Sequence, residues 1–146
     1  MPRHEEQKVL PYPPEFIFDI VADVRKYPDF LPWCVASRVF REKPNDFHAD
    51  VVIGFKVFRE TWTSRVHLDK PNAVLVDYIK GPMKHLHNEW RFTPHADGTL
   101  VDFVLDFEFE NPIMQKVAGA LFEEAVHRMV GAFEKRAAEL AGEGKA

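Results

Sequence analysis

The feature that most constrains the fold is a strict two-residue alternation placed directly before a long amphipathic segment. From Val101 to Phe109 every second residue is apolar, and the residues between them are acidic except Val104. Such alternation predicts a strand with one buried face. Asn111 and Pro112 then suit the cap and first turn of a helix with an apolar face of 3.6-residue period. A helix of this length must lie on a large apolar surface, and we expect a sheet to supply it.

Turn signals divide the rest of the chain into further strands. Pro44-Asn45-Asp46, Lys70-Pro71-Asn72 and Asp97-Gly98 are typical turn sequences, and a weaker one lies in 54–57. A first strand is weakly indicated over Arg3–Leu10, followed by a helix from Pro14 to Lys26. Regular spacing of this kind predicts an antiparallel meander. Its strands are expected near 34–42, 47–54, 58–69, 73–80, 86–94 and 99–109.

Length and charge set the outer limits. We expect one domain over residues 1–146, with a free tail from about 142 because Gly142 suits a helix end. The net charge of −4, with both signs interspersed, argues against binding DNA. The single Cys34 excludes an internal disulfide and indicates a reducing compartment. No apolar run has the length of a signal core or a membrane span, so we expect a cytoplasmic protein, at most peripheral at the inner membrane.

An apolar connection stands out between the first helix and the strand at 34–42. Residues 27–34 read Tyr-Pro-Asp-Phe-Leu-Pro-Trp-Cys. Prolines prevent a continuous helix and remove backbone donors. A connection this apolar either closes the end of a core or faces an apolar partner.

Residues 27–34 and three later stretches together resemble one known family. The later stretches are 59–66, then 81–83 with 88–92, then 107–109 before the last helix. In this order they resemble the coenzyme Q-binding branch of the START-like, polyketide cyclase and lipid-transport superfamily, to which ribosome-association toxins are related. The resemblance covers roughly Arg3 to Ala141. It implies an α+β helix-grip fold: a curved antiparallel sheet of about seven strands around the C-terminal helix, with one or two short helices after the first strand.

Alternation indicates which side chains face the helix. These residues either interdigitate as a close-packed core or surround a ligand, and the resemblance favours a cavity. The apolar ligand-binding candidates are Trp33, Val51, Ile53, Trp62, Trp90, Phe92, Phe103, Phe107, Leu121, Phe122 and Met129. Phe30, Leu31 and Pro32 are the candidates for the cavity mouth, with closure of the core as the alternative role of their segment.

Three inward positions are polar: Glu60, Ser64 and Asn88. A buried polar group without a partner costs about 1–3 kcal/mol. One hypothesis is that the three side chains bind the head group of the ligand. The alternative is that they lie at wetted strand ends or at a bulge, or that Glu60 pairs with an arginine.

Signals for catalysis are weak. His85 and His87 share one strand face and could chelate a metal, but no third ligand has an evident claim. Cys34 could act as a nucleophile only if a base activated it, and its position beside Trp33 favours a small buried apolar residue. No phosphate loop or serine elbow occurs. We therefore predict no catalytic residue, no metal and no required cofactor.

The residues and the resemblance together favour a binding role over an enzymatic one. The expected function is binding of ubiquinone or a related isoprenoid quinone as a chaperone or delivery factor for respiration, with peripheral membrane contact. One alternative is a toxin-like protein that binds the large ribosomal subunit and blocks subunit association. The other is a polyketide cyclase-like enzyme.

Overall fold

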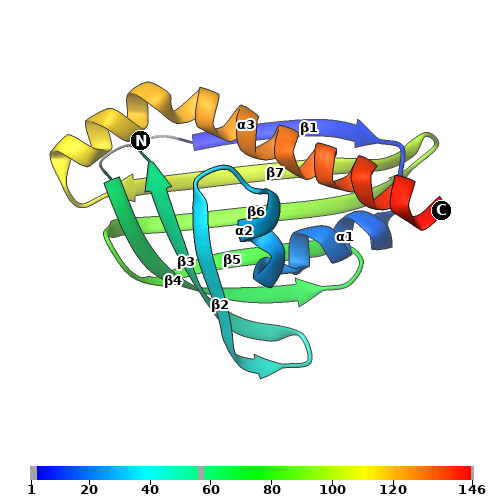
Figure 1. Cartoon of the computed structure of the whole chain (residues 1–146), viewed down its shortest axis with the longest axis horizontal. Helices are drawn as coiled ribbons and strands as arrows, with labels where there is room; N and C mark the ends of the chain where they lie inside the picture. Colours follow the sequence, from blue (N-terminus) through cyan, green and yellow to red (C-terminus); the bar gives the residue numbers. More distant parts are fainter. Residues whose placement is uncertain (1–2, 56–57, 146) are drawn as a thin grey trace.

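The protein folds into one curved antiparallel sheet with its helices on the concave side (Figure 1). A computed structural model describes residues 3–55 and 58–145. The strand order is β1-β7-β6-β5-β4-β3-β2, so β2 to β7 form a meander and β1 pairs with β7. The elements are β1 Arg3–Leu10, α1 Pro14–Ala22, η1 Val24–Lys26, α2 Tyr27–Phe30, β2 Cys34–Lys43, β3 Asp46–Phe55, β4 Phe58–Asp69, β5 Ala73–Lys80, β6 Met83–His95, β7 Gly98–Phe109 and α3 Pro112–Lys145. The expected helix-grip arrangement is confirmed.

The helix predicted over 14–26 is in fact divided. It ends at Ala22 because Asp23 adopts φ −85° and ψ 71°, and the chain continues as the 3₁₀ turn η1. The aromatic segment begins as the short helix α2, with Pro28 in its first turn, where we expected a loop. Proline is compatible with a first helical turn because the amide it lacks would have no helical partner there.

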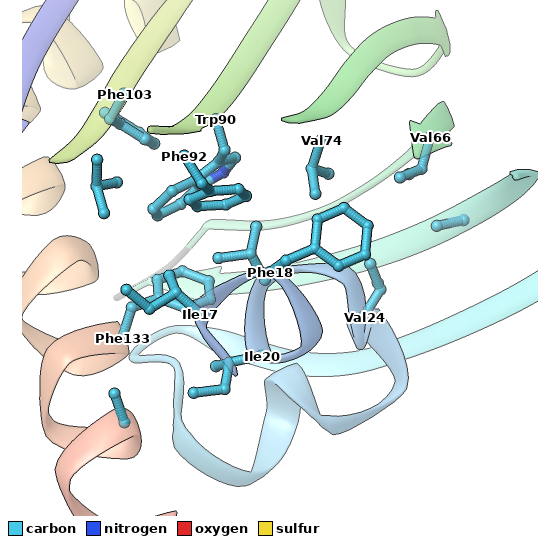
Figure 2. Close-up of a cluster of buried hydrophobic side chains, with 14 of the residues drawn as sticks. Ile17, Phe18, Ile20, Val24, Val66, Val74, Trp90, Phe92, Phe103 and Phe133 are labelled. Carbon is cyan, nitrogen blue, oxygen red and sulfur yellow. The ribbon is translucent and has the colours of Figure 1, made fainter. Parts of the chain in front are cut away.

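Helix α1 packs on the concave face against β5 and β6. Its Ile17, Phe18, Ile20 and Val21 are buried. The ring of Phe18 meets Phe92 of the sheet edge-on at a centroid distance of 6.1 Å (Figure 2). Residues from α1 and from the sheet therefore form one continuous core.

Helix α3 joins this core from Val126 onward. Val126, Phe133 and Ala137 are buried, and the ring of Phe133 lies 4.9 Å from that of Trp90 (Figure 2). The helix continues to Lys145, past Gly142, where we expected it to end and a free tail to begin. Gly142 is exposed, and a Cβ placed at this residue would have no neighbour within 4 Å.

Strand bounds agree with the turn signals except at β6. This strand starts at Met83, three residues before the predicted start, because Met83 pairs with Phe109 and His85 with Glu108 across a register shift. The Asp97-Gly98 turn is confirmed, and Gly98 has φ +135°. A Cβ at Gly98 would lie 2.1 Å from the carbonyl oxygen of Leu10, so the close approach of β1 requires glycine.

Candidate ligand site on the concave face

Most inward-facing side chains from β3 to β7 are fully buried near α1 and half-buried toward the end of the sheet where α3 begins. Two residues depart from this trend: Leu68 of β4 is half-buried near α1, and Met83 of β6 is buried at the opposite end. On β3, for example, Ala49 is buried whereas Val51 and Ile53 are not. We call the second group the half-buried patch, which consists of Val51, Ile53, Trp62, Leu86, Leu105 and Phe107. The patch is an apolar part of the concave face that the protein covers incompletely.

The predicted apolar site residues fall into both groups. Trp90, Phe92 and Phe103 are fully buried in the core. Trp33, Val51, Ile53, Trp62, Phe107 and Met129 are half-buried. Leu121 and Phe122 lie outside the residues whose side chains the structure describes. Ligand contact by any of these residues stays a prediction, and the half-buried members have the incompletely covered surface that a ligand needs.

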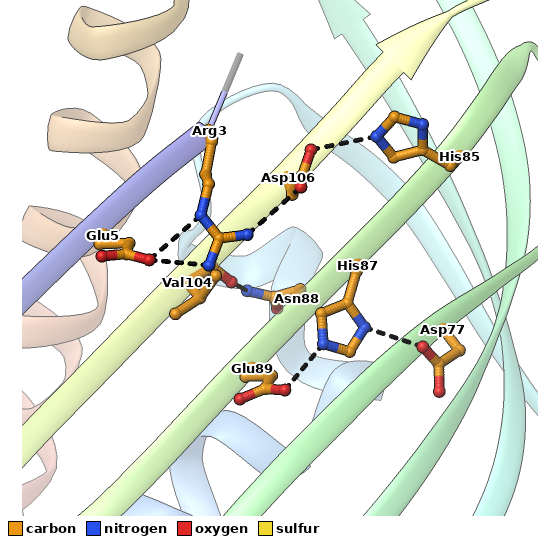
Figure 3. Close-up of polar contacts among 9 residues, drawn as sticks. All are labelled: Arg3, Glu5, Asp77, His85, His87, Asn88, Glu89, Val104 and Asp106. Carbon is orange, nitrogen blue, oxygen red and sulfur yellow. Dashed lines mark hydrogen bonds and ion pairs between the residues drawn. The ribbon is translucent and has the colours of Figure 1, made fainter. Parts of the chain in front are cut away.

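Asn88 holds the ring of Trp90 in place. Its Oδ1 accepts a hydrogen bond from Trp90 Nε1 at 3.1 Å. Its Nδ2 donates to the backbone oxygen of Val104 at 2.8 Å (Figure 3). Because both ends of the amide are engaged, Asn88 has less capacity to bind a ligand than its inward position alone indicates.

Ser64 and Glu60 differ from Asn88 because the structure shows them no bonded partner. Ser64 is 3% exposed, and its Oγ has no hydrogen-bond partner among the described residues. Glu60 is half-buried, and no ion pair to an arginine is found for it within 3–55 and 58–145. Tyr78, directly opposite Ser64 on β5, adds a third polar group that we did not select from the sequence. The two-residue alternation of Val74, Val76 and Tyr78 in the sequence could have placed Tyr78 on the inward face.

The aromatic segment 27–34 contributes mainly to packing. The rings of Tyr27 and Phe30 lie 5.5 and 5.2 Å from Phe133 of α3. The guanidinium of Arg136 lies 5.4 Å from the centre of the Phe30 ring. Burial raises the pKa of Tyr27 well above its usual range, and its hydroxyl donates to the Val21 carbonyl. Phe30 thus supports closure of the core, whereas its role at a cavity mouth stays a prediction.

The other predicted mouth residues are half-buried at the entry to β2. Leu31 packs against the core, and Pro32 is also half-buried. Trp33 has φ +66°, and its carbonyl oxygen accepts a 2.8 Å hydrogen bond from the Gly54 amide of β3. A positive φ is unusual for a large side chain. The segment is therefore tied to β3 near the half-buried patch.

Two hollows lie elsewhere in the described structure, and neither suits a long apolar ligand. A cavity of about 30 Å³ lies among Trp90, Phe133 and α1, which is enough for one water molecule at most. A groove of about 360 Å³ between α1 and the β4–β5 turn is partly polar, and Lys70 and Asp19 form a 3.0 Å ion pair at it. The core under the C-terminal half of α3 is thus closely packed.

Three arginines on the outer face of the sheet are paired with acidic side chains. Arg65 pairs with Asp46, and Arg38 pairs with Asp50 at 2.9 Å. The pKa of Asp46 is lowered by its hydrogen bond from Arg65. Arg91 lies 3.2 Å from Glu89. An arginine paired in this way offers less positive potential to a polyanion than a free one.

His85 and His87, the pair considered for metal binding, both contact carboxylates. His85 Nε2 lies 3.0 Å from Asp106, and His87 lies 2.8 Å from both Asp77 and Glu89 (Figure 3). The hydrogen bond to Glu89 is the largest cause of the raised pKa of His87. No group of three or more side chains suited to a metal is found in the described part of the chain.

Cys34 is a poor nucleophile. It is buried, and burial raises the pKa of its thiol to about 11. At neutral pH the reactive thiolate is therefore scarce. The residue behaves as a small apolar side chain at the start of β2.

Comparison with known proteins places the chain in a family. A family model described as polyketide cyclase / dehydrase and lipid transport matches residues 10–134. The chain belongs to this family. Within 3–55 and 58–145, no helix combines the length and apolar character needed to cross a membrane.

Two curated relatives carry different functional names. The ribosome association toxin RatA of Rickettsia prowazekii is 38% identical over 140 residues, which cover 93% of this chain and 96% of the toxin. The mitochondrial coenzyme Q-binding protein COQ10 homolog B of Xenopus laevis is 35% identical over 144 residues, which cover 95% of this chain and 59% of the relative. The family therefore includes relatives with both of these functional names at similar sequence identity.

Solved structures have the same fold. The 18 kDa protein CC1736 of Caulobacter crescentus has a TM-score of 0.81 and 36% identity, with 97% of this chain and 99% of that chain covered. A START superfamily protein of Mycobacterium smegmatis has a TM-score of 0.78 at 18% identity, with 94% and 98% covered. The second likeness concerns the fold alone.

Proposed function

We propose that this protein binds a hydrophobic small molecule, such as an isoprenoid quinone, on the half-buried patch and acts as a non-enzymatic carrier. The observation that carries the proposal is that the apolar inward residues of the half-buried patch, on β3, β4, β6 and β7, are incompletely covered toward the end of the sheet where α3 begins. A ligand tail placed there would complete the cover of side chains such as Trp62 and Phe107. The name of the coenzyme Q-binding relative supports this ligand class.

The energetics of such a site are favourable. Burial of one methylene contributes about 0.8 kcal/mol, and micromolar affinity requires about 8 kcal/mol. A few isoprene units exceed this value before the cost of ordering the ligand is subtracted. The tail does not need to be fully enclosed, since half-buried aromatic side chains such as Trp62 already present large apolar surfaces.

Native mass spectrometry tests the proposal. We expect protein purified from quinone-rich cells under mild conditions to carry an added mass, and organic extraction to release a quinone. The control is the same protein unfolded and refolded without lipid, which should lack the added mass and regain it when a short-tailed quinone is supplied. Recovery of no lipid from the cells, together with no uptake by the refolded protein, would contradict the proposal.

The toxin relatives favour a second candidate, association with the large ribosomal subunit. The observation is the 38% identity to RatA over nearly the full length of both chains. Against it, three arginines of the outer face, Arg38, Arg65 and Arg91, are paired with acids, although the exposed Arg59 of the same face has no ion pair among the described residues. If this role holds, the protein should co-sediment with isolated large subunits at low salt and dissociate as salt is raised. Sedimentation without subunits is the control, and absence of binding at low salt rejects the role.

A further inference from the structure

Exposed large apolar side chains gather at one end of the molecule. In the described part of the chain four of them are exposed: Val9, Val35, Ile79 and Ile113. Val35 lies at the start of β2, Ile79 at the end of β5 and Ile113 in the first turn of α3, so all three are at the end of the sheet where α3 begins. Val9, near the end of β1, lies at the opposite end. Single exposed apolar residues are ordinary, whereas their concentration at one end indicates a surface for an apolar partner.

The two exposed isoleucines belong to segments that are bonded to each other. Ile79 lies in 79–84, which contains the β5–β6 turn, and Ile113 lies in 110–116, at the start of α3. We call 79–84 and 110–116 together the rim, and Figure 1 shows both segments at the end of the molecule where α3 begins. The amide of Glu110 donates to the carbonyl oxygen of Pro82 at 3.0 Å. The isoleucines are therefore presented by two segments that lie side by side.

The rim adjoins the half-buried patch. A Cβ placed at Gly81 would lie 2.6 Å from the Cβ of Trp62, so the β5–β6 turn lies directly against a residue of the patch. On the other side, the ring of Phe107, also in the patch, lies 5.5 Å from the ring of Phe109, where β7 ends before α3. The uncovered apolar surface of the concave face therefore continues to the rim and its exposed isoleucines.

Lysines dominate the charge of the rim. Its charged residues are Lys80, Lys84, Lys116 and Glu110, in a chain whose net charge is −4. Lys84 pairs with Glu108 at 3.1 Å. Lys80 and Lys116 are exposed, and neither has an ion pair within 3–55 and 58–145. Exposed isoleucines flanked by lysines suit a partner with an anionic surface above an apolar layer, because a lysine can keep its ammonium at the polar boundary.

The solubility of the proposed ligand class favours a bilayer as this partner. Transfer of each methylene of an isoprenoid tail from lipid to water costs free energy. A carrier that meets the bilayer with the open end of its site takes up the tail without exposing it to water. The rim lies at this end of the patch.

We infer that the rim docks on the surface of a bilayer that contains anionic phospholipids. Ile79 and Ile113 insert at the boundary between head groups and acyl chains, and Lys80 and Lys116 contact the lipid phosphates. In this orientation the half-buried patch opens toward the bilayer, and the ligand enters past the β5–β6 turn and the start of α3. The inference rests on the proposed function for the purpose of the contact, and it adds the partner and the surface.

Co-flotation with vesicles tests the charge of the docking surface. We expect the wild-type protein to bind phosphatidylcholine vesicles that contain about one third phosphatidylglycerol at least about tenfold more tightly than pure phosphatidylcholine vesicles, and to dissociate as salt is raised. Lys80→Gln combined with Lys116→Gln should weaken binding about thirtyfold. The control is Lys43→Gln combined with Lys135→Gln, which makes the same charge change at exposed lysines outside the rim. Its affinity should stay within about threefold of wild type.

A second pair of variants tests insertion of the apolar side chains. Ile113 is 71% exposed, and Ile113→Ser should weaken vesicle binding about fivefold. Val9→Ser, which changes an exposed apolar residue at the opposite end, should leave vesicle binding unchanged. All variants should keep the circular dichroism spectrum of wild type, since the substituted side chains are exposed.

Binding of a decyl-substituted benzoquinone without vesicles separates this inference from the proposed function. Rim variants that lose vesicle binding and keep quinone affinity would support the docking surface. Vesicle binding that is equal in wild type and rim variants would overturn it, as would a parallel loss of quinone and vesicle binding in the rim variants. A wild-type protein that binds the quinone but no anionic vesicle at low salt would overturn the docking surface and leave the proposed function intact. Binding of neither would overturn both proposals.

Discussion

Trp90→Ala lowers the free energy of unfolding by about 3–5 kcal/mol, the range measured for loss of large buried aromatic side chains. Trp90 is 5% exposed. Its ring lies 4.7 Å from Phe103 and 4.9 Å from Phe133, so it joins the sheet to α3. The substitution also leaves Asn88 Oδ1 without its donor, which adds to the loss. Urea denaturation followed by circular dichroism measures the effect.

Trp62→Ala is the matched control because it makes the same chemical change in the half-buried patch. Trp62 is only half-buried, so less apolar contact is lost and we expect less than about half of the destabilisation seen for Trp90. If both substitutions lowered the free energy of unfolding equally, the patch would be part of the core and not a surface available to a ligand.

Val51→Glu weakens binding of an apolar ligand by at least about a hundredfold. Val51 lies directly opposite Trp62, in the middle of the half-buried patch. A carboxylate there would lose its water beneath the ligand tail, at a cost of several kcal/mol, and each 1.4 kcal/mol is tenfold in affinity. The ligand-free protein should stay folded because the position is half-buried. Displacement of a bound apolar fluorescent dye by a decyl-substituted benzoquinone measures the affinity for the quinone. Circular dichroism checks the fold.

Val52→Glu controls for the charge itself. It adds the same charge to the next residue of β3, which faces the outer side of the sheet opposite Thr61. We expect its ligand affinity to stay within about threefold of wild type, since a surface charge change acts weakly. Equal affinity of Val51→Glu and Val52→Glu would remove the half-buried patch from consideration as the ligand site.

Helix α3 is attached to the sheet in two different ways. Phe133 packs its C-terminal half against aromatic rings of the core. Along β1 three of the inward positions, His4, Glu6 and Lys8, are polar, and Glu6 lies 3.8 Å from His127 while Lys8 pairs with Glu134. Partly exposed ion pairs contribute little stability compared with a buried aromatic cluster. The aromatic cluster is therefore the main attachment of α3 among the described contacts.

Local sequence signals predicted most of the fold. Strands 58–69 and 73–80 match β4 and β5 because turn residues mark both ends. The alternation in β7 correctly placed Val101 and Phe103 in the core. The two inaccurate helix ends, near Asp23 and at Gly142, lie where local propensity permits more than one backbone path. The polar inward face of β1 was missed because a strand without apolar alternation has only a weak local signal.

By itself the sequence determined which side of each strand faces the helices, because side chains alternate strictly along a strand. Only the tertiary structure decided how completely each inward side chain is covered. Coverage depends on where α1 and α3 lie, and this separates the buried Ala49 from the half-buried Val51. The same holds for the polar positions: Asn88 is engaged by Trp90, a residue two positions along its own strand, and by Val104 of the adjacent strand, whereas Ser64 is left without a partner in the described structure. Partners across a sheet are set by strand register and packing, which a pattern within one strand does not encode.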